Sequence, residues 1–290
     1  TGVQTCALPI CVATELAGMR VLFDGVPAPV SYVVRGQVSV VVPYEVAGHA
    51  STAVVVEYQG ERTEPVTIPV VAAAPALFTL DGSGLGQAGM LNQSGCCNSA
   101  ANPAARGTLA SLYATGEGQT RPRGQTGRVS AYDSVSKYPR PAGPVQVFVG
   151  GVAARIEYAG EAPHAVAGLL QVNFRVPATA PIGDAVPVVL MIGGIRSSEQ
   201  ATMAVRPAQQ QVLLVEPDAA IRRRLERALK QAGFNVLGED AANQPVDLVV
   251  AAMPSAADMV TSLRQLRPKL KVIATARALD AEVLRTADLA

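Results

Sequence analysis

The sequence of 290 residues contains no tryptophan, and aromatic residues make up only 4% of it. Small aliphatic residues, chiefly valine and alanine, must therefore fill its cores. It has two histidines and four cysteines, and none of them stands at a spacing typical of zinc ligands, so we expect no metal site. Charged residues amount to 16% and the net charge is +1, so neither nucleic acid nor an anionic membrane is an expected partner. No apolar run reaches the ~18 residues of a membrane-spanning helix.

What is present is a globular composition, 49% apolar, whose pattern changes near residue 208. Before that point, short valine-rich runs are interrupted by glycine and proline, which is typical of an antiparallel β-sandwich. After it, apolar runs alternate with charged amphipathic stretches, which favours an α/β unit. The sequence therefore predicts β-sandwiches up to residue 207, a linker at 208–211 and an α/β domain over 212–290.

The β part contains an internal repeat of three elements that recur in the same order. The matching elements are VLFDGVPAPVSY (21–32) with VFVGGVAARIEY (147–158), QVSVVVP (37–43) with QVNFRVP (171–177), and Gly60 and Arg62 with Gly194 and Arg196. The glycine after the first strand, Gly25 or Gly151, predicts a hairpin turn with positive φ. We place the first copy at 12–74, truncated because it lacks the lead-in strand GTLASLYATGEG, and the second at 75–207.

Several segments of the β part together resemble a known family. They are APALFTL, GQAGMLNQSG, NSAANPAARGTLASLYATGEG, PVQVFVGGVAARIEYAG and GLLQVNFRVP. As a set they resemble a C-terminal module common in large secreted proteins of Acidobacteria, with an Ig-like fold of the IPT/TIG kind. The resemblance covers roughly residues 12–207 and implies extracellular or surface-associated modules with no known catalytic residues. It supplies no ligand, and an unknown protein or glycan is the expected partner.

The remainder of the chain predicts alternating strands and helices. VLLV predicts a buried strand, Asp218 the N-cap of the next helix, and Gly233 its end. Further strands are expected at VDLVVAAMP and KVIAT, and a further helix from about Asp280. This order resembles the receiver domain of bacterial response regulators, which has a flavodoxin-like parallel sheet and works in the cytoplasm. The expected fold class is thus tandem all-β Ig-like sandwiches, the first truncated, followed by an incomplete α/β flavodoxin-like receiver fragment.

The acidic pocket of a receiver is matched only in part. Glu216 and Asp218 occupy its acidic positions, where Mg²⁺ would bind, and Thr275 matches the hydroxyl that senses the phosphoryl group. Ala251 and Ala252 stand where the phosphoacceptor Asp is expected, and alanine offers no oxygen nucleophile. The resemblance therefore implies a pseudo-receiver that binds a signalling protein without being phosphorylated and without a cofactor. The alternative is a response-regulator protein that works in a phosphorelay.

Other features of the β part favour structure over chemistry. The glycines of DGSGLGQAG at 81–89 do not open a helix, so a loop is favoured over a dinucleotide site. Cys96 and Cys97 could form a strained vicinal disulfide, but a polar loop with free thiols is favoured. No G-x-S-x-G elbow or catalytic-triad order is visible, so we expect no enzyme.

The opening decapeptide TGVQTCALPI differs from everything that follows it. It has no Lys or Arg and no apolar core, so it is not a secretory signal. All ten of its residues match the in-frame translation of a sequencing adapter used in short-read libraries. We therefore exclude residues 1–11 from the fold and expect them to pack poorly.

Overall fold

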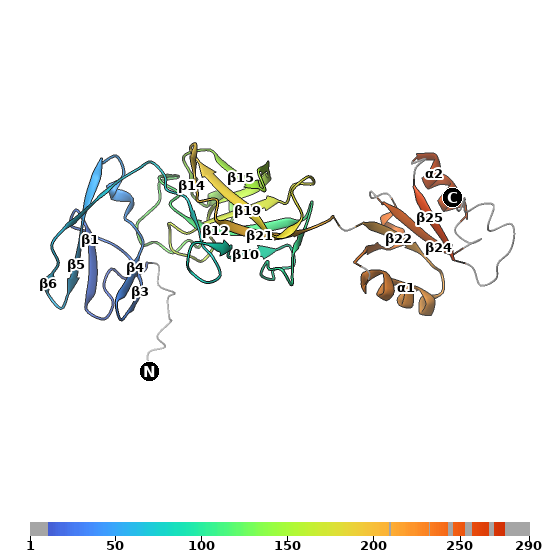
Figure 1. Ribbon diagram of the computed structural model, residues 1–290, viewed down its shortest axis with the longest axis horizontal. Coiled ribbons are helices and arrows are strands. Elements are labelled where there is room, and N and C mark those ends of the chain that lie inside the picture. Colours follow the sequence, from blue (N-terminus) through green and yellow to red (C-terminus); the bar gives the residue numbers. More distant parts are fainter. Residues whose placement is uncertain are drawn as a thin grey trace. The chain divides into compact units, whose positions relative to one another are not determined.

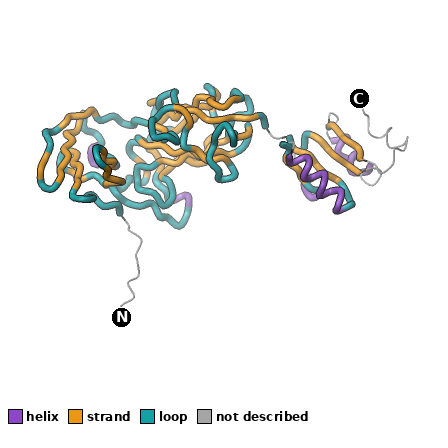
Figure 2. The backbone as a smooth tube through the Cα atoms, turned by 60° about the horizontal axis from the view of Figure 1, so that its bottom comes forward, coloured by secondary structure: helices purple, strands orange, loops and turns teal. Residues whose placement is uncertain are grey.

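The computed structural model describes residues 11–208, 210–231, 233–242, 246–252, 257–266 and 270–275 (Figure 1). The chain divides into two compact units, the first ending at Pro207 and the second beginning at Ala208. In the described ranges most of the regular structure is strand, arranged in several sheets, and the two α-helices lie in the second unit (Figure 2). None of the helices described there is long and apolar enough to span a membrane. The decapeptide at 1–10 lies outside the described residues.

The first part of unit 1, here called module 1, comprises residues 11–70. Its elements are β1 (Met19–Phe23), β2 (Val26–Pro27), β3 (Val30–Val34), β4 (Gln37–Val40), the 3₁₀ helix η1 (Tyr44–Val46), β5 (Ser51–Tyr58), β6 (Glu61–Arg62) and β7 (Val66–Pro69). One sheet has the order β2-β1-β5-β6 with β7 also on β5, while β3 and β4 form a separate two-stranded sheet. Their shared core is small, because Val21, Phe23, Ala28 and Val46 are its fully buried members.

The rest of unit 1, here called module 2, comprises residues 71–207. Its strands are β8 (Ala76–Leu77), β9 (Gly86–Gln87), β10 (Met90–Asn92), β11 (Ala104–Ala105), β12 (Leu109–Thr115), β13 (Thr120–Arg121), β14 (Arg140–Pro141), β15 (Val145–Val149), β16 (Val152–Ala153), β17 (Arg155–Glu161), β18 (Leu170–Arg175), β19 (Gly183–Ile192), β20 (Ile195–Arg196) and β21 (Ala201–Arg206), with the 3₁₀ helix η2 (Val135–Lys137). The sheet β10-β12-β18-β17 and the sheet β11-β21-β19-β15-β16 enclose one large apolar core. This arrangement is a β-sandwich, and alternate residues of each strand point into it.

The two modules share their strand pairing as well as their sequence pattern. In module 1, Val30 pairs with Val40 and Tyr32 with Ser39, so that one residue of β3 is skipped. In module 2, Ile156 pairs with Phe174 and Tyr158 with Asn173, and the same bulge interrupts β17. The hairpins before them also correspond, because β1 pairs with β2 as β15 pairs with β16. The positive φ expected at the turn glycines is confirmed, with 84° at Gly25 and 81° at Gly151.

Unit 2 is built around four parallel strands. Its elements are β22 (Gln211–Val215), α1 (Ala219–Gln231), β23 (Asn235–Leu237), the 3₁₀ helix η3 (Glu239–Ala241), β24 (Leu248–Ala252), α2 (Ala257–Leu266) and β25 (Lys271–Thr275). The strand order is β23-β22-β24-β25. VLLV forms the buried strand that the sequence predicts, since all four of its side chains are buried. The expected helix end is confirmed, because Gly233 adopts a φ of 88° and its N–H donates to the carbonyl of Lys230.

The expected fold class is wrong. The described chain is mostly β with several sheets and two α-helices, and no α/β flavodoxin-like fragment is evident. The helical spacing of Ile221, Leu225, Ala228 and Leu229 places these four residues on one face of α1. The first, second and fourth are only half-buried and Ala228 is exposed, so α1 buries no side chain fully. Leu225 and Leu229 nevertheless pack against Val212, Leu214 and Val250 of the sheet. The helix expected from Asp280 lies outside the described residues.

The asparagine-rich segment after β10 has a structural role. Asn98 is completely buried, and its side chain pairs with the backbone of β21, donating to the carbonyl of Ala204 at 2.9 Å and accepting from its N–H at 2.7 Å. The Asn98 amide also bonds Gln87 and Asn92. The side chain of Asn98 thus takes the place of a neighbouring strand at Ala204 of β21. This polar motif is explained by folding alone.

We expect Asn98→Ala to destabilise unit 1 by about 3 kcal/mol, because both backbone groups of Ala204 lose their bonds to the amide and stay buried. Asn173→Ala is the control, since Asn173 is half-buried and its amide oxygen accepts from Gln171, and it should cost less than about 1 kcal/mol. The measurement is urea unfolding followed by tyrosine fluorescence. All seven tyrosines lie between Tyr32 and Tyr158, so this signal follows unit 1 only. Equal losses for the two variants would contradict the role given to Asn98.

Candidate functional site

The residues predicted from the receiver resemblance meet at one edge of the parallel sheet. Val215 pairs with Ala251 and Ala252 pairs with Thr275, so the carboxyl ends of β22, β24 and β25 are level with one another. Glu216 follows β22 directly and is buried. The alanines at 251 and 252 provide no polar side-chain atom at this edge.

The two carboxylates of that edge bond to the backbone. Glu216 Oε1 accepts from the N–H of Asp218 at 3.0 Å. Asp218 Oδ1 accepts from the N–H groups of Ala220 and Ile221 at 2.8 and 3.2 Å, which confirms Asp218 as the N-cap of α1. Within the described ranges, no group of three or more His, Cys, Asp or Glu side chains could hold a metal ion. These bonds order the start of α1.

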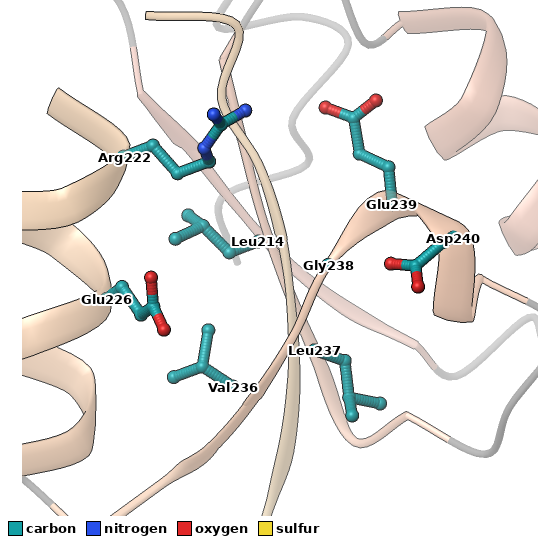
Figure 3. A pocket seen from close by; sticks show the side chains of 8 residues that line it. All are labelled: Leu214, Arg222, Glu226, Val236, Leu237, Gly238, Glu239 and Asp240. Carbon is teal, nitrogen blue, oxygen red and sulfur yellow. The ribbon is translucent and has the colours of Figure 1, made fainter. Parts of the chain in front are cut away.

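A cavity of about 370 Å³ lies beside this sheet, between α1 and the segment that follows β23 (Figure 3). Its lining residues are Leu214, Arg222, Glu226, Val236, Leu237, Gly238, Glu239 and Asp240. Arg222 and Glu226 project from α1, whereas Glu239 and Asp240 come from η3. The side chain of Glu226 pairs with Lys230 on the same helix, and this hydrogen bond lowers the pKa of Glu226. The cavity is open, because only Leu214 in its lining is buried.

A different polar cluster, which sequence reasoning missed, is buried inside unit 1. Its first member is Glu117, which is 3% exposed and lies between two glycines in the loop after β12. Gly116 and Gly118 adopt φ values of 76° and 73°. A Cβ on Gly116 would lie 1.8 Å from the carbonyl oxygen of Ala74, and one on Gly118 would lie 2.0 Å from that of Ala72. The two glycines therefore let the loop press against this segment and place Glu117 inside.

Tyr44 of η1 is the partner of Glu117 across the two modules. Its hydroxyl donates to Glu117 Oε1 at 2.7 Å, its N–H donates to Thr126 Oγ1 at 3.0 Å, and its carbonyl accepts from Gln119 Nε2 at 2.9 Å. A Cβ on Gly124 would lie 2.5 Å from the tyrosine ring, so that glycine makes room for it. Module 2 thus bonds every polar group of Tyr44.

Glu161, at the end of β17, is the second buried carboxylate and is 1% exposed. Its Oε2 accepts from the hydroxyl of Ser130, which is also buried. Its carbonyl accepts from Tyr158 Oη at 2.7 Å, and its N–H donates to the carbonyl of Pro139 at 2.9 Å. These bonds hold the end of β17 against the loop that carries Ser130.

Burial shifts the proton equilibria of this cluster. It raises the pKa of Glu117 to about 7, and the charge of Glu161 adds to this effect. It also raises the pKa of Glu161, although the hydrogen bond from Ser130 and the charge of Arg128 oppose the change. Burial, followed by the charge of Glu117, raises the pKa of Tyr44. Glu117 Oε2 is buried without a hydrogen-bond partner among the described residues, so the acid keeps its proton more readily than an exposed one.

This arrangement joins the two modules through a buried hydrogen bond. Catalysis by a carboxylic acid needs the acid to reach a substrate, and these two carboxylates are closed off from solvent. No scan of family models and no search of the curated proteins found a match to this chain. Function is therefore inferred from the two modules and the contact between them.

We expect Tyr44→Phe to destabilise unit 1 by about 2 kcal/mol, because it leaves both oxygens of buried Glu117 without a donor while keeping the ring. Tyr58→Phe is the matched control, since Tyr58 lies in the same module and is exposed. Urea unfolding followed by tyrosine fluorescence measures both. If Tyr44→Phe were as stable as the control, the hydroxyl would not be part of the contact.

Unit 1 should also lose stability as the pH rises. The folded pKa of Glu117, about 7, lies above its ordinary value of 4.5, so between these values the folded state binds more protons than the unfolded state. This stabilisation is complete below pH 4.5 and is lost as the pH rises through 7, by about 3 kcal/mol at about 1.4 kcal/mol per pKa unit.

Glu117→Gln, which cannot ionise, should remove most of this loss and make unit 1 more stable than wild type at pH 8. Glu64→Gln, at an exposed position of module 1, is the control and should keep the wild-type profile. Unfolding curves collected from pH 4 to 8 give the comparison. An unchanged pH profile in Glu117→Gln would assign the loss to other groups, of which Glu161 is the next to test.

Proposed function

We propose that residues 12–207 are two non-catalytic β-sandwich modules of the Ig-like kind, which hold a binding surface at a fixed spacing on a secreted or surface-associated protein. The observation that carries the proposal is the bonding of Tyr44, whose hydroxyl, N–H and carbonyl all bond to module 2. Linked modules move relative to one another by default unless their interface restrains them. A buried, fully bonded tyrosine is such a restraint.

Further bonds between the modules support a fixed spacing. The N–H of Val12 donates to the carbonyl of Gly127 at 2.7 Å. The hydroxyl of Thr126 donates to Glu45 Oε2 at 2.6 Å while it accepts from Tyr44. These contacts flank the buried pair on the loop that follows β13.

The resemblance to Ig-like modules of secreted proteins supports a binding role, with a protein or a glycan as ligand. The polar side chains most suggestive of chemistry are used internally. Asn92 donates to the carbonyl of Asn102, and Asn102 donates to that of Cys97. Glu117 is buried at the module contact, and Glu161 is buried within module 2. These four polar side chains thus stabilise loops and the module contact.

If the modules hold a fixed spacing, residual dipolar couplings of the full chain should fit one alignment tensor for modules 1 and 2. Tyr44→Ala should split the fit into two tensors, because the hydroxyl and ring contacts are lost. Tyr58→Ala, an exposed position of module 1, should leave one tensor. Separate tensors in the wild-type protein would overturn the fixed spacing, and turnover of a polysaccharide or ester substrate would overturn the non-catalytic role.

A further inference from the structure

The junction between modules 1 and 2 encloses an acid that both modules help to cover. Glu117 belongs to module 2, but the group that donates to its carboxyl is the hydroxyl of Tyr44 in module 1, at 2.7 Å from Oε1. Both residues are buried. Part of the cover that keeps water from this acid therefore comes from the other module.

The backbone around Glu117 holds the acid in this place. The N–H of Ala74 donates to the carbonyl of Gly116 at 2.9 Å, which fixes the loop against the segment that precedes β8. A Cβ on Gly116 or Gly118 would overlap carbonyl oxygens of that segment, so the loop already lies as close to it as the backbone permits. The carboxyl of Glu117 therefore gains water when Tyr44 moves away from it.

The titratable groups that face Glu117 give its carboxylate no counter-charge. Burial does most to raise its pKa, and the charge of Glu161, at the end of β17, adds to the rise, while the hydrogen bond from Tyr44 opposes it. Tyr158, also on β17, lies within reach of the charge of Glu117. The segment 71–75 has no titratable side chain. Among the described residues, no Lys, Arg or His forms an ion pair with Glu117.

Two cations lie in the same region but act on other groups. Arg128, in the loop after β13, has a charge that lowers the pKa of Glu161, and its guanidinium lies 4.8 Å from the ring centroid of Tyr132. Arg140, on β14, lies 5.7 Å from the ring centroid of Tyr158. The acid at the junction forms no ion pair with either cation.

The two protonation states of this acid favour different states of the junction. Glu117 Oε2 is buried and has no hydrogen-bond partner among the described residues. A protonated acid is neutral there, whereas a carboxylate would keep a negative charge away from water with one donor. Opening the junction would hydrate both oxygens. Ionisation therefore favours the open junction, and protonation favours the closed one.

We propose that the junction is a proton-controlled joint, which holds modules 1 and 2 at a fixed spacing while Glu117 is protonated and opens at Tyr44 when the acid releases its proton to solvent. The inference rests on the proposed function, because it describes how that spacing is regulated. Neither Tyr44 nor Glu117 belongs to the apolar core cluster of its module, so each module stays folded when the joint opens.

The size of the effect follows from the linkage between protonation and opening. In the open joint Glu117 lies in water with its ordinary pKa of 4.5, and in the closed joint its pKa is about 7. The closed joint is therefore favoured most below pH 4.5, and this preference is lost as the pH rises through 7. The ratio of open to closed joint should rise by about 300-fold in all, and by about thirtyfold between pH 5.5 and 8.

Hydrogen exchange of the full chain tests the joint, because the N–H of Tyr44 donates across it to Thr126 Oγ1. At pH 5.5 this amide should be less protected than those of Val55 in β5 and Val172 in β18, since it exchanges when the joint alone opens. After correction for the intrinsic exchange rate, its protection should fall by about thirtyfold at pH 8.

Two variants assign this fall to one carboxyl group. Glu117→Gln keeps an oxygen for the hydroxyl of Tyr44 but cannot ionise, so the protection of the Tyr44 amide should be the same at pH 5.5 and pH 8. Glu64→Gln, at an exposed position of module 1, is the matched control and should keep the wild-type fall.

Three results would overturn the joint: a Tyr44 amide as protected as those of Val55 and Val172, a protection that does not change with pH, or an equal fall in Glu117→Gln. The failure of the proposed function looks different, because it appears as separate alignment tensors for the two modules already at pH 5.5. One tensor at pH 5.5 together with a pH-independent Tyr44 amide would reject the joint alone.

Discussion

The hydrogen bond from Tyr44 to Glu117 is the contact on which the relation between the two modules depends. It joins residues 73 positions apart and lies inside a loop that only glycine permits at two positions, because a Cβ on Gly116 or Gly118 would overlap backbone carbonyls. A buried carboxylate is costly unless it is neutral or well bonded. Here Glu117 has one donor and a pKa raised to about 7, so the protonated acid is the form that this site tolerates best.

Local features of the fold could be predicted from the sequence because they depend on neighbouring residues alone. The positive φ at Gly25 and Gly151, the N-cap at Asp218 and the helix end at Gly233 all follow from short-range sterics and hydrogen bonding. The fold class could not be predicted in this way. It depends on how much of the chain becomes strand and on how the strands assemble into sheets, which contacts between distant segments determine.

The buried cluster could not be predicted from the sequence for a related reason. Tyr44, Glu117 and Glu161 come from separate segments, and their spacing matches no motif. The one local signal was an acidic residue between two glycines, G-E-G, whose meaning depends on the carbonyls of Ala72 and Ala74. Glu216 and Asp218 stood out because they are adjacent to a strand end, and their carboxylates accept hydrogen bonds from backbone N–H groups. Glu216 and Asp218, which the sequence pattern singled out, thus lie at a helix start. Glu117, which matches no motif, forms the module contact.

The repeat separates what local sequence determines from what the surroundings determine. Val42 and Val176 stand in the same local sequence and follow strands with the same register, yet their exposures are 52% and 1%. Pairing and register therefore follow from the segment itself, whereas closure of the core requires a second sheet of sufficient width. Among the described residues, the core cluster of module 1 has four buried members and its second sheet has two strands. The free energy gained from apolar burial is proportional to the area covered. A core this small therefore gives module 1 little stability of its own. The bonds that module 2 makes to Tyr44 add to this stability.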